Sequence, residues 1–111
     1  MTKKLNCLVV DDETDIRELL VLTLDRMGID TDSASNVEDA KHMLKQRNYA
    51  LCLTDMRLPD GNGIDLVKHI GQHHAGLPVA VITAFGSAEN AVSALKAGAF
   101  DYLTKPISLK Q

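Results

Sequence analysis

Acidic side chains crowd together near the start of the chain. Asp11, Asp12, Glu13 and Asp15 fall within five positions directly after an apolar run, and Asp55 directly follows another. Carboxylates that converge repel one another unless a proton or a cation offsets their charge. Oxygen ligands without histidine or cysteine suit a hard cation, so we predict a Mg²⁺ site at Asp11, Asp12 and Asp55. Helix capping is the alternative, but it accounts for Asp11 alone.

Two further side chains would complete a site for phosphorus chemistry. Thr83 ends an apolar run, and Lys105 follows the last one. An aspartate beside Mg²⁺ can attack phosphorus as a nucleophile and form an aspartyl-phosphate. The Lys105 ammonium and the Thr83 hydroxyl can meet the charged oxygens of the transferred group. No general base is evident beside them, so we expect release of the phosphoryl group to water to be slow.

Alternating apolar runs and helical patterns must position these residues. Strands are expected at residues 5–10, 29–34, 49–54, 78–83 and 100–103. Strands separated by helices of about ten to fifteen residues build a parallel sheet with right-handed crossovers, and its site lies at the carboxyl ends of the strands. We therefore predict an α/β fold with a doubly wound, five-stranded parallel sheet.

Helices are expected from Glu13 to Met27, after the capping-box sequence Ser35–Glu38, after the turn sequence Leu58–Gly63 and after Ser87. Within that turn sequence, Asp60 is interpreted as a turn residue. The residues predicted to pack inward are Ile16, Leu19, Leu20, Leu24 and Met27, then Val37, Ala40, Met43 and Leu44, then Ile64, Val67 and Ile70, and finally Ala88, Ala91, Val92 and Leu95.

A fifth helix would follow Pro106 in such a fold, but only residues 107–111 remain to begin it. We therefore expect residues 1–111 to be one domain with its final helix largely absent, the N-terminal fragment of a longer protein. Uncovered apolar surface beside the sheet would favour self-association.

Composition narrows the classes of function. The chain has 111 residues, 45% of them hydrophobic and 24% charged, with a net charge of −3. These values fit one folded domain and oppose direct nucleic-acid binding, which needs clustered Lys and Arg. No apolar run is long enough to span a membrane and no signal-peptide pattern is present, so a cytoplasmic location is expected. Cys7 and Cys52 lie in apolar runs and are predicted to be buried free thiols.

The chain resembles the receiver domains of bacterial two-component response regulators. The similarity is carried by VVDDE at 9–13, LTDMRLPDGNGIDL at 53–66, TAFGS at 83–87 and ALKAGAFDYLTKPI at 94–107. It covers essentially the whole chain and implies the strand order 2-1-3-4-5. Residues 83–106 further resemble the nitrogen-regulator class, and MRLPDGNGIDLV resembles regulators of pilin expression within it.

The resemblance implies roles in metal binding and phosphorylation. Asp55 would be the phospho-acceptor, Asp12 a direct Mg²⁺ ligand and Asp11 its neighbour, acting through water. The backbone carbonyl of Arg57 would be the third protein ligand, and Lys105 would pair with the phosphoryl group.

The resemblance also implies a conformational switch. Thr83 would be its hydroxyl and Tyr102 its aromatic residue, and the Lys105–Pro106 peptide would be cis. Packing gives an independent reason to expect movement here, because the helix after Ser87 has a small, alanine-rich inner face.

A sensor histidine kinase is the implied phosphoryl donor. In the nitrogen-regulator class, the output is an ATPase module that acts on sigma-54 polymerase, followed by a DNA-binding domain, both outside this chain. A homodimer or other self-association is expected. Catalysis would be limited to the domain's own phosphorylation and slow dephosphorylation, so the chain is not expected to be an enzyme.

Other functions remain open at this stage. A phosphorylation-independent interaction module could share the fold. A flavodoxin-like protein would need a phosphate loop where residues 11–14 are acidic, and a haloacid-dehalogenase-type phosphohydrolase would need an acid where Arg57 stands. His69, His73 and His74 suggest either a metal site or a solvated helix end. We favour the helix end, because the sequence indicates no third convergent ligand.

Overall fold

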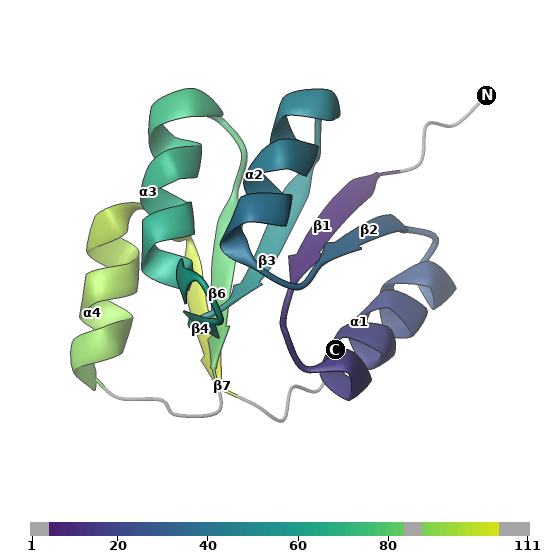
Figure 1. Ribbon diagram of the computed structural model, residues 1–111, viewed down its shortest axis with the longest axis horizontal. Coiled ribbons are helices and arrows are strands. Elements are labelled where there is room, and N and C mark those ends of the chain that lie inside the picture. Colours follow the sequence, from purple (N-terminus) through teal and green to yellow (C-terminus); the bar gives the residue numbers. More distant parts are fainter. Residues whose placement is uncertain (1–4, 84–87, 105–111) are drawn as a thin grey trace.

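The computed structural model describes residues 5–83 and 88–104 of the chain. Its centre is a five-stranded parallel sheet in the order β2-β1-β3-β6-β7 (Figure 1). Its strands are β1 (Asn6–Val10), β2 (Asp30–Ala34), β3 (Leu51–Asp55), β6 (Val79–Thr83) and β7 (Asp101–Thr104). The helices are α1 (Thr14–Arg26), α2 (Val37–Gln46), α3 (Gly63–His73) and α4 (Ala88–Ala97). A short antiparallel pair, β4 (Arg57–Leu58) and β5 (Gly61–Asn62), follows β3.

The predicted doubly wound fold is confirmed. Counted along the chain without the short β4–β5 pair, the strands of the parallel sheet have the order 2-1-3-4-5. The expected start of a fifth helix, at residues 107–111, lies outside the described residues. No helix within the described ranges is long and apolar enough to cross a membrane.

The sheet separates two hydrophobic layers. Helices α2, α3 and α4 cover one face, and α1 lies on the other (Figure 1). Successive strand residues point to opposite faces, so Leu8 and Val10 pack under α2–α4 while Cys7 and Val9 pack under α1. Cys52 lies in the α2–α4 layer. Both cysteines are fully buried free thiols, as predicted, and burial raises the pKa of Cys7 to about 12.

The core face of α1 is narrower than predicted. Leu20 and Leu24 are buried and Ile16 packs against them, but Leu19 and Met27 are more than half exposed. Leu19 precedes Leu20 by one residue, which turns its side chain by about 100° around the helix axis. Met27 is the residue that caps the helix end. The prediction that both pack in the core is therefore wrong.

The inner face of α4 also differs from the prediction. Ala94 is fully buried and Ala91 is partly buried, whereas Val92 and Leu95 are each 50% exposed. Small side chains let the helix backbone lie close to α3 and β7, so the larger ones point outward. The side chain of Ala88 lies outside the described set. For α2 and α3 the prediction holds, with Met43 and Ile64 at the edge of the core.

The N-terminus of α2 is capped differently from the predicted Ser35–Glu38 box. The cap residue is Asn36, whose Oδ1 accepts from the backbone N–H of Asp39 at 2.7 Å. The backbone N–H groups of Val37 and Glu38 instead donate to the Asp60 carboxylate, at 2.7 and 2.9 Å. Asp60 is therefore more than a turn residue, because it satisfies two amides that the helix itself leaves unpaired.

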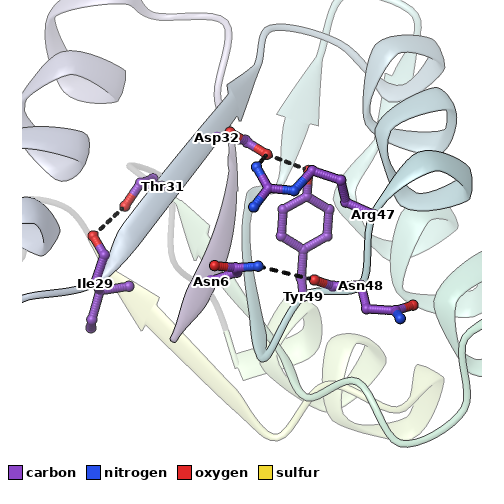
Figure 2. A network of polar contacts seen from close by, with 7 residues as sticks. All are labelled: Asn6, Ile29, Thr31, Asp32, Arg47, Asn48 and Tyr49. Carbon is purple, nitrogen blue, oxygen red and sulfur yellow. Dashed lines mark hydrogen bonds and ion pairs between the residues drawn. The ribbon is translucent and has the colours of Figure 1, made fainter. Parts of the chain in front are cut away.

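A polar network fixes the end of α2 against the edge strand (Figure 2). Both Arg47 Nη1 and the Tyr49 hydroxyl donate to Asp32 Oδ2 at 2.7 Å, and the Arg47 guanidinium lies 5.8 Å from the Tyr49 ring centroid. Burial, followed by the hydrogen bond to Asp32, raises the Tyr49 pKa. The network positions the segment that leads into β3.

Candidate functional site at the carboxyl ends of the strands

Three carboxylates meet where the central strands end. Asp11 and Asp12 follow β1, Asp55 ends β3, and one oxygen of each lies within 4.8 Å of the others. Asp11 and Asp55 are buried, whereas Asp12 is exposed. The structure thus brings together residues more than 40 positions apart in sequence, because β1 and β3 are adjacent and parallel.

Hydrogen bonds hold both the backbone and the carboxylate of Asp11. Its backbone N–H donates to the carbonyl of Ala34 at 3.0 Å, and its Oδ1 accepts from the Glu13 N–H at 2.9 Å. Arg17 in α1 donates from Nη1 to the Asp11 carbonyl at 2.8 Å. The cap residue of α1 is Glu13, so Asp11 binds the amide just before the helix and does not cap its first turn. Helix capping therefore does not account for the convergence of Asp11 with Asp12 and Asp55. The sequence analysis did not identify Arg17, because an arginine in a helix is usually exposed and nothing in the neighbouring residues indicates its hydrogen bond to Asp11.

Asp55 is fixed by the segment that follows it. The Met56 N–H donates to the backbone carbonyl of Ile82 at 2.9 Å, and the Gly63 N–H donates to the backbone carbonyl of Met56 at 2.8 Å. A Cβ added to Gly63 would lie 2.2 Å from the Asp55 carbonyl oxygen. Only glycine therefore allows the start of α3 to approach the end of β3 this closely. The sequence indicated Gly63 as a turn residue, not as a support of the site.

Thr83 and Tyr102 lie on the two strands beyond Asp55. Asp55 is in register with Ile82, so Thr83 is one residue further along β6, and its side chain is buried. Tyr102 is in register with Val81 and packs against the α2–α4 layer. Its buried hydroxyl has no hydrogen-bond partner among the described residues.

The remaining predicted positions divide into two groups. Arg57 is in β4, two residues after Asp55, with its side chain exposed. Lys105 and the Lys105–Pro106 peptide lie outside the described residues. Of the predicted site positions, the structure therefore describes the three carboxylates, Arg57, Thr83 and Tyr102.

The donor chemistry of the acidic cluster fits a hard divalent cation. Its side-chain ligands are all oxygens, two of them on buried carboxylates. Three negative charges at this separation repel strongly in a partly buried site, and a dication would offset that repulsion.

Sequence comparison defines the class of protein. The profile of the response regulator receiver domain matches residues 7–111, so the chain belongs to the response regulator receiver family and is a phosphorelay receiver domain. It is 62% identical over 102 residues to the response regulator protein PilR of Pseudomonas aeruginosa, covering 92% of this chain and 23% of PilR. It is 36% identical over 111 residues to the regulatory protein AtoC of Escherichia coli, covering 100% of this chain and 24% of AtoC. The chain thus spans about a quarter of each relative's length.

Solved structures agree with this assignment. The beryllofluoride-activated NtrC4 receiver domain dimer has a TM-score of 0.88 and 35% identity, covering 93% of this chain and 85% of that one. A Burkholderia pseudomallei response regulator, solved with a phosphorylated aspartic acid, a calcium ion and citrate, has a TM-score of 0.90 and 28% identity. That match covers 95% of this chain and 62% of the other.

Proposed function

We propose that Asp55 accepts a phosphoryl group from a sensor histidine kinase, with Mg²⁺ held by Asp11, Asp12, Asp55 and the Arg57 carbonyl. The observation that carries the proposal is the convergence of three carboxylates at the carboxyl ends of β1 and β3. The phosphorylated aspartic acid and calcium ion of the Burkholderia pseudomallei relative support it. When bound, Mg²⁺ would neutralise charge on the acidic groups and on the phosphoryl oxygens.

The protein groups have separate tasks in this proposal. An Asp55 carboxylate oxygen attacks phosphorus while the bond from phosphorus to the donor nitrogen breaks. Thr83 and Lys105 bind the phosphoryl oxygens, by hydrogen bond and by charge respectively. Self-phosphorylation and slow dephosphorylation are then the only reactions that the domain catalyses.

The switch would follow from the position of Thr83. When its hydroxyl moves toward the phosphoryl group, it leaves space into which the Tyr102 ring can turn, and α4 adjusts. The half-buried ring of Tyr102, whose hydroxyl has no hydrogen-bond partner in the described ranges, supports this step. Amide exchange compared with and without beryllofluoride tests it, and unchanged protection across residues 88–104 would refute the switch.

The output is proposed from the relatives. PilR and AtoC are about four times as long as this chain, which leaves room in such proteins for further domains. We propose a cytoplasmic regulator whose ATPase and DNA-binding domains lie outside residues 1–111 and activate sigma-54-dependent transcription. A homodimer is proposed as well, because the related NtrC4 receiver was solved as a dimer.

Intact-mass measurement after incubation with Mg²⁺ and acetyl phosphate tests the acceptor. We expect one added phosphoryl group on the wild type and none on Asp55→Asn or on an EDTA-treated sample. Equal labelling of Asp55→Asn would remove Asp55 as the acceptor. Absence of labelling together with absence of Mg²⁺ binding would favour the phosphorylation-independent interaction module.

A further inference from the structure

Three histidines gather at the end of α3, away from the acidic cluster. His69 and His73 are one helical turn apart, and their ring centroids lie 4.6 Å from each other. His74 caps the helix, and its ring centroid lies 5.7 Å from that of His69. The structure therefore brings a third imidazole to the pair, which the sequence pattern did not indicate.

The central ring has an unsatisfied polar atom. His69 Nε2 is shielded from solvent and has no hydrogen-bond partner among the described residues. Leaving such an atom unpaired costs free energy, which a metal bond or a hydrogen bond would recover. Burial, assisted by the charges of His73 and Lys41, lowers the His69 pKa. The ring is therefore largely neutral at pH 7, in the form that binds metals.

We infer that His69, His73 and His74 form a binding site for a divalent transition metal ion such as Zn²⁺. Imidazole ligands favour zinc, nickel and copper over magnesium. Two imidazoles on one tetrahedral Zn²⁺, with Zn–N bonds of about 2.1 Å, have ring centroids about 5 Å apart. The observed separations of 4.6 and 5.7 Å lie on either side of that value.

The surroundings of the three histidines make one favourable and one unfavourable electrostatic contribution to metal binding. The C-terminal end of a helix carries partial negative charge, which favours a cation. Lys41 and Lys45 on α2 act electrostatically on His69, and their positive charges oppose a dication. With at most three protein ligands and these lysines nearby, the site should bind more weakly than a closed four-ligand zinc site.

Side-chain rotation must complete the site. Among the described residues, only the acidic cluster already has three metal-ligating atoms within 4.8 Å of one another. His73 is exposed, so its ring can turn on a nanosecond timescale to bring a nitrogen toward His69 and His74. The bound ion would join the end of α3 to the segment that leads into β6. Along the axis of α3, His69 and His73 lie about 9 and about 15 Å from Gly63, which adjoins the end of β3.

Zn²⁺ titration by calorimetry in excess Mg²⁺, added to occupy the proposed magnesium site at the acidic cluster, tests the histidine site. We expect one Zn²⁺ per chain, with affinity lowered about tenfold or more by His69→Gln or His73→Gln and less by His74→Gln. His42→Gln is the matched control, because His42 is the remaining histidine and lies exposed on α2. Its affinity should equal that of the wild type. Equal affinity in all five proteins, or an equal loss in His42→Gln, would overturn the inference.

Imidazole NMR signals give a second readout that does not depend on any substitution. Zn²⁺ should shift the ring resonances of His69, His73 and His74 and leave those of His42 unchanged. Unchanged imidazole signals of His69, His73 and His74, or an equal shift at His42, would overturn the inference. Phosphoryl uptake is expected to be unaffected by the histidine variants, so this proposal and the one for Asp55 can fail separately.

Discussion

The segment after β3 is held in place by hydrogen bonds, whereas helix α4 is attached mainly by the packing of small side chains. Between Asp55 and Gly63, the chain is tied to β6 by the backbone hydrogen bond from Met56 to Ile82, and to α2 by the Asp60 carboxylate. Helix α4 buries Ala94 fully but leaves Val92 and Leu95 half exposed. Asp55, the proposed acceptor, is therefore tightly held, while among the described side chains of α4, beside the proposed switch residues, only Ala94 is fully buried. That division would suit the proposed switch, in which the Asp55 carboxylate stays fixed while a neighbouring element moves.

The largest effect on stability is expected at Gly63, where the segment that follows β3 packs most closely. Gly63→Ala would place a methyl group 2.2 Å from the Asp55 carbonyl oxygen. We expect a loss of about 3 kcal/mol in the free energy of unfolding, together with slower phosphoryl uptake. Urea denaturation and intact-mass kinetics measure the two effects.

Gly71→Ala is the matched control in the same helix. A Cβ at Gly71 would meet nothing within 4 Å. Alanine is the better helix former, so we expect stability to rise by up to about 1 kcal/mol with uptake unchanged. Equal stabilities for the two variants would show that the contact at Gly63 relaxes easily, and the contrast with α4 would weaken.

The second effect concerns the small inner face of α4. Ala94→Val adds two methyl groups at a fully buried position against α3 and β7. We expect a loss of about 1–3 kcal/mol from overpacking, measured by thermal unfolding. A fully stable Ala94→Val protein would mean that α4 shifts freely enough to absorb the added volume.

A smaller effect is expected from the contact between the segment that follows β3 and α2. Asp60→Ala removes both acceptors of the Val37 and Glu38 amides, so the melting temperature should fall. Hydrogen bonds from these amides lower the Asp60 pKa. The contribution is therefore complete above the unfolded pKa of about 3.9 and lost as the pH falls through the lower folded pKa.

Stability measured between pH 7 and pH 2 checks that dependence. The difference between wild type and Asp60→Ala should shrink at the acid end. Asp60→Asn, which keeps one oxygen acceptor, should fall between the two proteins at pH 7. A difference that stays constant over this range would show that the carboxylate charge has no part in the contact.

The smallest effect is expected for the exposed face of α4. Val92→Ala and Leu95→Ala should each change stability by no more than about 0.5 kcal/mol, because both side chains are half exposed already. Urea denaturation provides the measurement. Losses as large as that of Ala94→Val would show that the outward face carries as much packing energy as the inner one.

The sequence allowed the sheet and the acidic cluster to be predicted for the same physical reason. Apolar runs mark buried strands, and parallel strands bring their carboxyl ends to one edge, which placed Asp11 beside Asp55. Side-chain hydrogen bonds between segments that are distant in sequence could not be predicted. Asp60 reaches α2 across 23 positions, and nothing local distinguishes it from an ordinary turn residue.

Hydrophobic periodicity predicted burial wrongly where packing against a neighbouring element decides which side chains are covered. Leu19 and Leu20 are equally apolar, but only Leu20 faces the sheet. On α4 the fully buried residue is Ala94, while the larger Val92 and Leu95 are half exposed, which reverses what hydrophobicity alone would indicate. His74 was named with His69 and His73, but the sequence could not indicate that its ring lies beside His69, because a residue beyond a helix end has no predictable direction.

The two cysteines also offer a way to observe each hydrophobic layer separately. Cys7 lies beneath α1 and Cys52 beneath α2–α4, on adjacent strands but on opposite faces of the sheet. Burial keeps both thiols protonated and therefore unreactive while their layer is closed. The alkylation rate of each thiol consequently reports how often its own layer opens. The chain therefore contains one intrinsic thiol probe for the face of the sheet that carries α4 and another for the face that carries α1.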